Sequence, residues 1–227
     1  MTPSTSQIRR IGRTNDRVKL CHVEVWFLDL DAPSRAAAFH AERNRRRFAE
    51  CRAHLRRILA SRTSLDPATI RFRYGSHGRP DLADNPLDLR FSVSHSSGQA
   101  VIAVTRQRDL GIDIEVSRRI DHVESLAQRY LAPAENEQLS LADDKVHAFW
   151  TAWTRKEAYL KALGTGLSGR ICEFAVSLSE PARLLTAAKP GDAAADWTLL
   201  DLSHSFMVAL AVRARRVSVE VHHHFDD

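Results

Sequence analysis

The chain has 227 residues, 44% apolar and 27% charged, with a formal net charge of +5, which is ordinary for one large globular domain or two small ones. No stretch approaches the roughly 18 consecutive apolar residues of a membrane span, and no secretory apolar segment opens the chain. The three cysteines are scattered and predict neither a disulfide framework nor a metal knuckle. We therefore expect a cytoplasmic protein with no membrane segment.

Positive charge is concentrated in the first half of the chain. Residues 1–108 hold 20 Lys and Arg against 10 Asp and Glu, whereas residues 109–227 hold 13 against 18. Halves of opposite charge can attract each other, and a basic half can also bind an anionic ligand. We expect a disordered basic N-terminus over 1–20, then an N-terminal subdomain over 21–108 and a C-terminal subdomain over 109–227.

In chain order, the hydrophobic patterns predict both strands and helices. A strand over 22–30 is followed by a helix from Ser34 to about Arg62, with nine arginines and two glutamates. Further strands are expected at 70–74, 89–95, 100–104 and 110–116, and then three helices at 121–131, from Pro133, and at 145–163. The first of these opens with the capping pattern of Asp121 and Glu124. Four strands end the chain, at 173–178, 197–202, 206–212 and 217–221.

Two segments resemble each other. Residues 89–106 and 199–215 both run from a strand through Ser-His-Ser to alternating small and branched apolar residues and a basic end. Short hairpin links outnumber long crossovers, so the sheets should be largely antiparallel. The fold class predicted is α+β, with two pseudo-duplicated halves, each an antiparallel sheet with packed helices.

The stretch "GIDIEV" carries paired carboxylates. On a strand, Asp113 and Glu115 share one face with Gly111, opposite Ile112 and Ile114. Two carboxylates about 7 Å apart repel unless a cation lies between them, and oxygen ligands select a hard cation such as Mg²⁺. A solvated strand face is the alternative.

The stretch "WTRKEAYLKALG" reads as a helix with an apolar stripe. Lys156 lies in the middle of the stripe, and Glu157 and Lys161 lie one above the other at its flank. Glu157 and Lys161 could form an ordinary helix ion pair with Lys156 turned outward. Glu157 could instead complete the acidic strand face as a third carboxylate.

Other groups could bind an anion. Ser94 and His95 end a strand in "FSVSHS", and Arg79 lies on the turn "GRP". The arginines at 43, 45, 46 and 47 are the strongest local anion attractor.

"GTGLSG" follows a helix, so we interpret it as a C-cap and loop instead of a dinucleotide motif. The run His222–His224 has no second ligand group at metal spacing and is assigned no metal.

Taken in order, GRP, FSVSHS, GIDIE and W-x-x-K-E-A-x-x-K-A-x-G-x-G-L resemble the surfactin-synthetase-activating type of 4'-phosphopantetheinyl transferases, over about residues 35–170. G-x-D-x-E together with W-x-x-K-E is specific, whereas either motif alone is weak. The resemblance implies a monomer of two similar α+β halves with coenzyme A bound in the cleft between them.

By this resemblance, Asp113, Glu115 and Glu157 would hold Mg²⁺ against the coenzyme A pyrophosphate. Lys161 and the Ser94–His95 pair would contact the phosphates.

Arg79 falls where the family usually has lysine, near the adenine and the 3'-phosphate. Arg47 matches the family's arginine for the 3'-phosphate, although Arg43 or Arg46 could be the true partner. Lys156 matches the motif lysine, and its position implies a pairing role near the metal.

The implied reaction is attack by a serine of an apo acyl or peptidyl carrier protein on the β-phosphorus of coenzyme A, with 3',5'-ADP leaving. Lys161 would stabilise the phosphoryl oxygens, and Glu157, directly or through water, would take the serine proton. Arg118 and Arg119 would face an acidic carrier protein.

Two other classes of function remain open at this point. A Mg²⁺-dependent nuclease or phosphatase would also use three carboxylates, but it leaves the SHS and GRP motifs unexplained. A non-enzymatic nucleic-acid-binding protein would use the basic half, but no nucleic-acid-binding motif is recognised in the sequence. We therefore expect no nucleic-acid partner.

Overall fold

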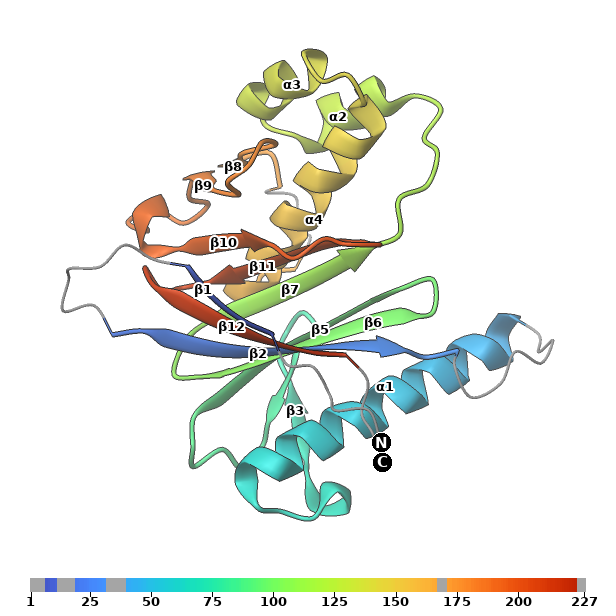
Figure 1. Cartoon of the computed structure of the whole chain (residues 1–227), viewed down its shortest axis with the longest axis vertical. Helices are drawn as coiled ribbons and strands as arrows, with labels where there is room; N and C mark the ends of the chain where they lie inside the picture. The colour runs from blue at the N-terminus through green and yellow to red at the C-terminus, as the bar shows by residue number, and fades with distance from the viewer. Residues whose placement is uncertain (1–6, 12–18, 32–39, 167–170, 224–227) are drawn as a thin grey trace.

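The computed structural model describes residues 7–11, 19–31, 40–166 and 171–223, and within it two halves repeat one order of strand, long helix and hairpin (Figure 1). The first half consists of β2 (Cys21–Asp29), α1 (His40–Thr63) and the hairpin of β5 (Leu89–Ser96) and β6 (Gln99–Arg106). Between helix and hairpin lie a short 3-10 helix (Pro67–Thr69), β3 (Phe72–Tyr74) and β4 (Pro80–Leu82).

The second half begins with β7 (Leu110–Glu115). The helices α2 (Val123–Tyr130), α3 (Pro133–Ser140) and α4 (Lys145–Leu163) follow, and then the hairpin of β10 (Thr198–Asp201) and β11 (Met207–Val212). Two short strands, β8 (Ala175–Val176) and β9 (Leu184–Thr186), and a 3-10 helix (Ala194–Asp196) precede that hairpin.

The order of the strands makes the repetition explicit. In the first half β5 pairs with β6 and β6 with β2, and in the second half β10 pairs with β11 and β11 with β7, all antiparallel. In both halves the hairpin's second strand is therefore central, and the strand before the long helix lies beside it. This arrangement confirms the predicted α+β class, its pseudo-duplication and its largely antiparallel pairing.

The structure differs from expectation at both ends of the chain. The strand β12 (Val217–His223), placed by sequence in the C-terminal subdomain, pairs parallel with β2 in the first sheet. β1 (Gln7–Ile11) pairs with β12, although residues 1–20 were expected to be disordered. Strand pairing with a segment some 200 residues away is not visible in a local pattern, so neither assignment could be made from sequence.

A shared core joins the halves. Val23 and Val25 of β2 pack with Ile112 and Ile114 of β7 and with Leu210 of β11, all at most 1% exposed. The apolar face that the alternation of β7 predicts therefore packs against the first sheet. The opposite face of β7 is covered by α4, while α1 packs on the first sheet through Leu55, Ile58 and Leu59 (Figure 1).

Several helix boundaries follow from local chemistry. In α4, the Asp144 carboxylate accepts a hydrogen bond from the backbone N–H of His147, and Gly164 ends the helix with φ of 71°. The predicted capping of α2 by Asp121 is wrong: its N-cap is His122, and the Asp121 carboxylate pairs with Arg119 at 3.0 Å. The predicted start of the first helix, from Ser34 to residue 39, lies outside the described residues.

None of the helices in the described part of the chain combines the length and the apolar character needed to cross a membrane.

Candidate active site

The site begins with a close contact between a strand and a helix. At Gly111 in β7, a Cβ atom would lie 2.1 Å from the carbonyl oxygen of Ala158 and 2.4 Å from the backbone nitrogen of Ala162. Only a residue without a side chain permits that approach. As a result, the flank of α4 that carries Glu157 and Lys161 lies against the strand that carries Asp113 and Glu115.

The three carboxylates predicted to act together interact electrostatically. Asp113 is 4% exposed, and its Oδ2 is buried without a hydrogen-bond partner among the described residues. The Oε1 atom of Glu157 is buried in the same way. Two buried, unpaired carboxylate oxygens are costly unless a cation or a proton satisfies them.

The environment of Glu157 raises its pKa to about 7. Burial is the largest cause, followed by the negative charge of Asp113; Glu115 adds to the effect, and Lys161 opposes it. Burial also raises the pKa of Glu115, although a hydrogen bond from Ser96 and the charges of Arg118 and Lys161 partly oppose that change. Near neutral pH, Glu157 is therefore able to accept or release a proton.

Lys161 reaches across to β7 and β5. Its ammonium donates to Asp113 Oδ1 and to the Ser94 hydroxyl oxygen, both at 2.7 Å, and the Ser94 hydroxyl donates to Asp113 Oδ1 at 2.7 Å. Lys161 thus forms an ion pair with Asp113. The ordinary helix pair with Glu157 is absent from the ion pairs between described residues. The ammonium, the hydroxyl and the carboxylate form a closed triangle at one side of the acidic face.

Serines of β5 join the two halves of the molecule. The Ser92 hydroxyl accepts from the backbone N–H of Ile112 at 3.1 Å, and the Ser96 hydroxyl donates to Glu115 at 2.9 Å. Together with Ser94, they occupy every second position of one strand. The sequence interpretation missed Ser92 and Ser96, although their spacing of two residues is the signal that places them on one strand face.

A cavity of about 330 Å³ opens between the halves, and we call it the inter-half pocket. The β3–β4 turn and β5 form one side, and α4 with the residues that follow it forms the other. Its lining residues are His77, Gly78, Arg79, Pro80, Phe91, Ser92, Val93, Glu157, Lys161, Gly164 and Gly166. The pocket therefore brings the GRP motif beside the two candidate residues of α4, Glu157 and Lys161.

Arg79 binds backbone oxygens in this structure. Its guanidinium donates to the carbonyl oxygens of Lys161 at 2.7 Å and Ala162 at 3.3 Å, at the end of α4, and more weakly to those of Phe91 and Leu110. Burial lowers its pKa. The contact with the adenine and 3'-phosphate expected from the sequence stays a prediction, and the observed contacts hold the β3–β4 turn against α4.

The remaining basic candidates lie at the other end of β5. His95 is exposed beside the β5–β6 turn. The Arg47 guanidinium donates to both carboxylate oxygens of Asp31 and lies against Gly98, where a Cβ would be 3.0 Å from it. Arg46 is 3.7 Å from the same Asp31 carboxylate. The structure thus brings Arg47 and Arg46 to one acid and leaves the choice of phosphate partner open.

Lys156 requires a correction. It was expected near the metal and the coenzyme, but its side chain is 0% exposed, and its ammonium donates to both oxygens of Glu135 and to the carbonyl oxygen of Phe174 at 2.6–2.8 Å. Glu135 also accepts from the backbone N–H groups of Ala132 and Val176. All donors of Lys156 are satisfied within the core, so it holds α4 to α3 and β8. The sequence interpretation missed Glu135, because a local pattern does not show the partner of a buried charge.

The acidic face fits a hard divalent cation by its chemistry. It offers three carboxylates, two of them with unpaired buried oxygens, beside a pocket. The three carboxylates do not form a closed centre. Among the described residues, a group of three ligand side chains with donor atoms all within 4.8 Å of one another is found on β2 and β12 instead. An open arrangement is appropriate for Mg²⁺, which keeps waters and takes phosphate oxygens as ligands.

Residues 109–211 match a family model described as the 4'-phosphopantetheinyl transferase superfamily. Over 180 residues the chain is 41% identical to the 4'-phosphopantetheinyl transferase HetI of Nostoc sp., covering 77% of this chain and 73% of that protein. It is 34% identical over 129 residues to the 4'-phosphopantetheinyl transferase Sfp of Bacillus subtilis, covering 56% of this chain and 55% of that protein. A solved structure of Thermotoga maritima holo-acyl-carrier-protein synthase is similar with a TM-score of 0.38 and 25% identity, covering 48% of this chain and 64% of that one.

Proposed function

We propose roles for individual residues on the premise that this chain belongs to the 4'-phosphopantetheinyl transferase superfamily. It is an enzyme that transfers phosphopantetheine from coenzyme A to carrier proteins. Asp113, Glu115 and Glu157 would hold Mg²⁺, which would supply positive charge for the pyrophosphate of coenzyme A. The observation that carries the assignment is the pair of buried, unpaired oxygens, Asp113 Oδ2 on β7 and Glu157 Oε1 on α4. Membership of the family confirms the resemblance drawn from the GIDIE and WTRKEA motifs.

The cation has a defined chemical purpose. When bound, Mg²⁺ supplies positive charge that neutralises the pyrophosphate oxygens and the negative charge that develops on them during transfer. The carboxylates of Asp113 and Glu115 belong to a strand packed between the first sheet and α4, so their positions change little when the ligand binds.

Lys161 stabilises the transferred and leaving phosphate oxygens. Its ammonium is held by Asp113 and Ser94 at 2.7 Å and lines the inter-half pocket. A positioned ammonium near the phosphate lowers the barrier because negative charge grows there in the transition state.

Glu157 takes the proton of the carrier serine, directly or through a water molecule. In the metal-free protein its pKa is about 7. The positive charge of a bound cation would lower that pKa, so the carboxylate is ionised and able to accept a proton at neutral pH. The serine oxygen forms a bond to the β-phosphorus, the bond from that phosphorus to the leaving oxygen breaks, and 3',5'-ADP departs with the electron pair. The proton held by Glu157 then passes to solvent.

The coenzyme lies in the inter-half pocket. Ser94 and His95 contact its phosphates, and Arg79 lies near the adenine. Arg47 binds the 3'-phosphate, after exchanging its present partner Asp31 for that dianion. Phosphate offers more charge than a carboxylate, so the exchange is favourable when the coenzyme is present.

The carrier protein docks beside the end of β7. Arg119 is 91% exposed, and the guanidinium of Arg118 lies 5.4 Å above the ring of Trp150. Acidic carrier helices would meet these arginines. We also propose that the protein is a monomer. The free state of Cys21, Cys51 and Cys172 supports the proposed cytoplasmic location, because the cytoplasm keeps thiols reduced.

The test is a mass measurement on the carrier. The protein is incubated with coenzyme A, Mg²⁺ and an apo carrier protein, and the carrier is then weighed by mass spectrometry. We expect one phosphopantetheine increment on one serine, and its loss when Mg²⁺ is removed by chelation. Asp113→Ala and Glu157→Ala should each abolish the increment while the far-ultraviolet circular dichroism remains that of the parent.

A matched control is Glu137→Ala, on the exposed side of α3, which should keep full transfer. Retained turnover in Asp113→Ala and Glu157→Ala would contradict the metal assignment. Cleavage of DNA or RNA without any increment across several carriers would favour the nuclease alternative.

A further inference from the structure

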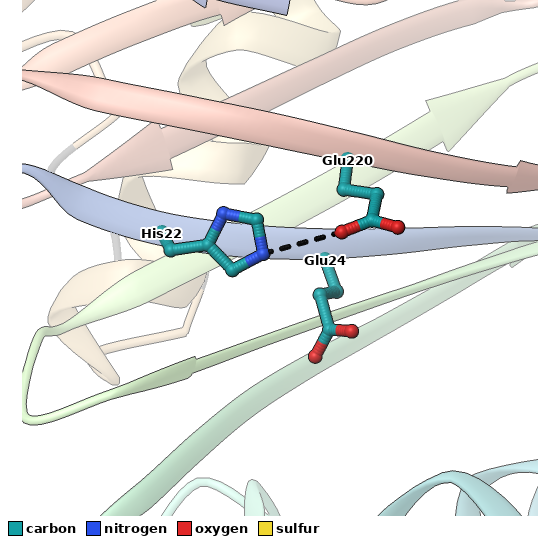
Figure 2. A group of neighbouring side chains, drawn as sticks. All are labelled: His22, Glu24 and Glu220. Carbon is teal, nitrogen blue, oxygen red and sulfur yellow. Dashed lines mark ion pairs between the residues drawn. The ribbon is translucent and has the colours of Figure 1, made fainter. Parts of the chain in front are cut away.

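A second group of ligand side chains lies on the first sheet, on strands from opposite ends of the chain. The parallel pairing of β2 and β12 places Ser218 opposite His22, Glu220 opposite Glu24 and His222 opposite Trp26. Figure 2 shows His22, Glu24 and Glu220 as neighbours on the two strands, with the imidazole of His22 directed at the Glu220 carboxylate. One donor atom from each of these three residues lies within 4.8 Å of the others.

One separation in this group matches the edge of a metal polyhedron. His22 Nε2 is 3.5 Å from Glu220 Oε2, too far for a good hydrogen bond. A tetrahedral zinc centre with bonds of 2.0–2.1 Å has ligand-to-ligand edges of about 3.4 Å. The pair is therefore spaced as two ligands of one ion would be.

The imidazole of His22 is already oriented for a ligand. Its Nδ1 lies 3.1 Å from the Ser218 hydroxyl, which leaves Nε2 facing the carboxylates. A hydrogen bond at the second ring nitrogen is how proteins fix the tautomer and the ring orientation of a histidine that binds a metal.

His222 lies beside this group of three. Its Nε2 is buried and has no hydrogen-bond partner among the described residues, and it lies 3.8 Å from one oxygen of Glu24 and 3.8 Å from one oxygen of Glu220. Its ring stacks on Trp26, with centroids 4.8 Å apart and planes at 12°. A ring held in this way and aimed at two carboxylates is an unsatisfied ligand.

The local charge leaves room for a dication. Arg62 donates to both oxygens of Glu24 and lies over the Trp26 ring at 5.5 Å. It neutralises one of the two carboxylates, so the group of His22, Glu24, Glu220, His222 and Arg62 keeps one net negative charge with neutral imidazoles. A divalent ion changes that balance to one net positive charge. The free-energy cost of placing the ion there is therefore smaller than the cost of burying an unpaired ion.

We propose that His22, Glu24 and Glu220, with His222 beside them, form a binding site for a divalent transition metal, with zinc the best match. Imidazole nitrogens combined with carboxylate oxygens favour Zn²⁺ over Mg²⁺, which prefers oxygen alone. The site lies on the β2–β12 face of the first sheet, whereas the catalytic acids lie on β7 and α4 of the second half. Its role is structural: the ion ties the last strand of the sheet to the first long one, across 196 residues of chain between His22 and Ser218.

The experiment uses the full chain without an affinity tag, stripped of metal, in excess Mg²⁺ so that the catalytic acids are occupied. Co²⁺ is titrated while its visible absorption is recorded, and Zn²⁺ is then added as competitor and measured by calorimetry. We expect one ion per chain, the intense absorption of a tetrahedral site, and a higher thermal midpoint with Zn²⁺. His22→Ala and Glu220→Gln should each weaken binding at least tenfold.

His223→Ala is the matched control for the histidine run. His223 follows His222 in β12 but stacks on Phe27, with centroids 5.3 Å apart, so strand alternation places it on the opposite face. It should bind Co²⁺ and Zn²⁺ like the parent. Phosphopantetheine transfer should be unchanged in Glu220→Gln, because this site is separate from the catalytic one.

Two outcomes would overturn the proposal. Binding that survives in both His22→Ala and Glu220→Gln would place the ion elsewhere in the chain. No binding to the parent protein would mean that the four side chains form only ion pairs with one another and with Arg62.

Discussion

Gly111 of β7 lies so close to Ala158 of α4 that the strand and the helix touch backbone to backbone, and a Cβ atom at position 111 would lie only 2.1 Å from the Ala158 carbonyl oxygen. This contact sets the distance between the two acids of the strand and Glu157 of the helix. A side chain at position 111 would push α4 outward and separate Glu157 from Asp113.

We therefore expect Gly111→Ala to lose transfer and to lower the free energy of unfolding by about 3 kcal/mol, since a clash with backbone atoms cannot be relieved by a rotamer change. Chemical denaturation and the carrier mass assay measure the two effects. Gly75→Ala is the control, because its Cβ would be 3.9 Å from the nearest atom. An unchanged free energy of unfolding in Gly111→Ala would contradict this prediction, because it would show that α4 can move away from β7 without loss of stability.

The raised pKa of Glu157 predicts how stability depends on pH when no metal is present. An ordinary glutamate loses its proton near pH 4.5, whereas Glu157 in the folded protein keeps its proton until about pH 7. Between these values the folded state binds a proton that the unfolded state has lost, so the free energy of unfolding falls as pH rises.

With chelator present, Glu157→Gln should remove this loss and be more stable than the parent above pH 7, by about 2 kcal/mol after allowance for solvent screening. Thermal unfolding from pH 5 to pH 8 measures it, with Glu137→Gln as the exposed control. Parallel pH profiles for the parent and Glu157→Gln would contradict the assignment.

The buried pair of Lys156 and Glu135 predicts a loss of stability without a loss of chemistry. Lys156→Met leaves a carboxylate unpaired in the core, which should cost about 3–5 kcal/mol of unfolding free energy. The ammonium of Lys156 contacts neither the inter-half pocket nor the three catalytic carboxylates. The folded fraction of the variant should therefore keep the Michaelis constant of the parent for coenzyme A. Steady-state kinetics measured well below the thermal midpoint test this. A raised Michaelis constant in a fully folded variant would support the coenzyme role first expected for Lys156.

The arginines at the start of α1 can be separated by the phosphate they bind. If Arg47 binds the 3'-phosphate, Arg47→Ala should lose about tenfold in apparent affinity for coenzyme A but little for 3'-dephospho-coenzyme A. Arg43→Ala and Arg46→Ala are the matched controls on the same helix. The same selective loss in either control, with Arg47→Ala unaffected, would transfer the role to that residue.

Arg119 predicts how the carrier protein is recognised. Arg119→Glu should raise the Michaelis constant for an acidic carrier several-fold at low ionic strength, and less in high salt, while that for coenzyme A stays constant. Arg71→Glu is the control, because Arg71 is likewise an exposed arginine paired to an aspartate, Asp84, at 3.0 Å. An equal effect in both variants would indicate general charge attraction and not a docking surface.

Much of the fold could be predicted because its signals are local. The alternation in "LGIDIEV" predicted that Ile112 and Ile114 share one face of a strand, and that face lies in the shared core. The apolar stripe of 145–163 predicted α4 with its observed bounds. The family motifs identified Asp113, Glu115 and Glu157 as candidates, and each lies on the element expected for it. Periodicity and motif spacing are properties of neighbouring residues, so the sequence by itself was sufficient for them.

Partners far apart in the chain were decided only by the tertiary structure. Lys156 was correctly seen as a charge on an apolar stripe, but Glu135, which satisfies it, comes from another helix. Likewise, His222 had no visible ligand partner in sequence, and β12 brought it within 3.8 Å of Glu24. Where a charge is buried, its partner is chosen by the packing of whole elements, and the free energy that selects that packing comes from the apolar core and not from the charged residues themselves.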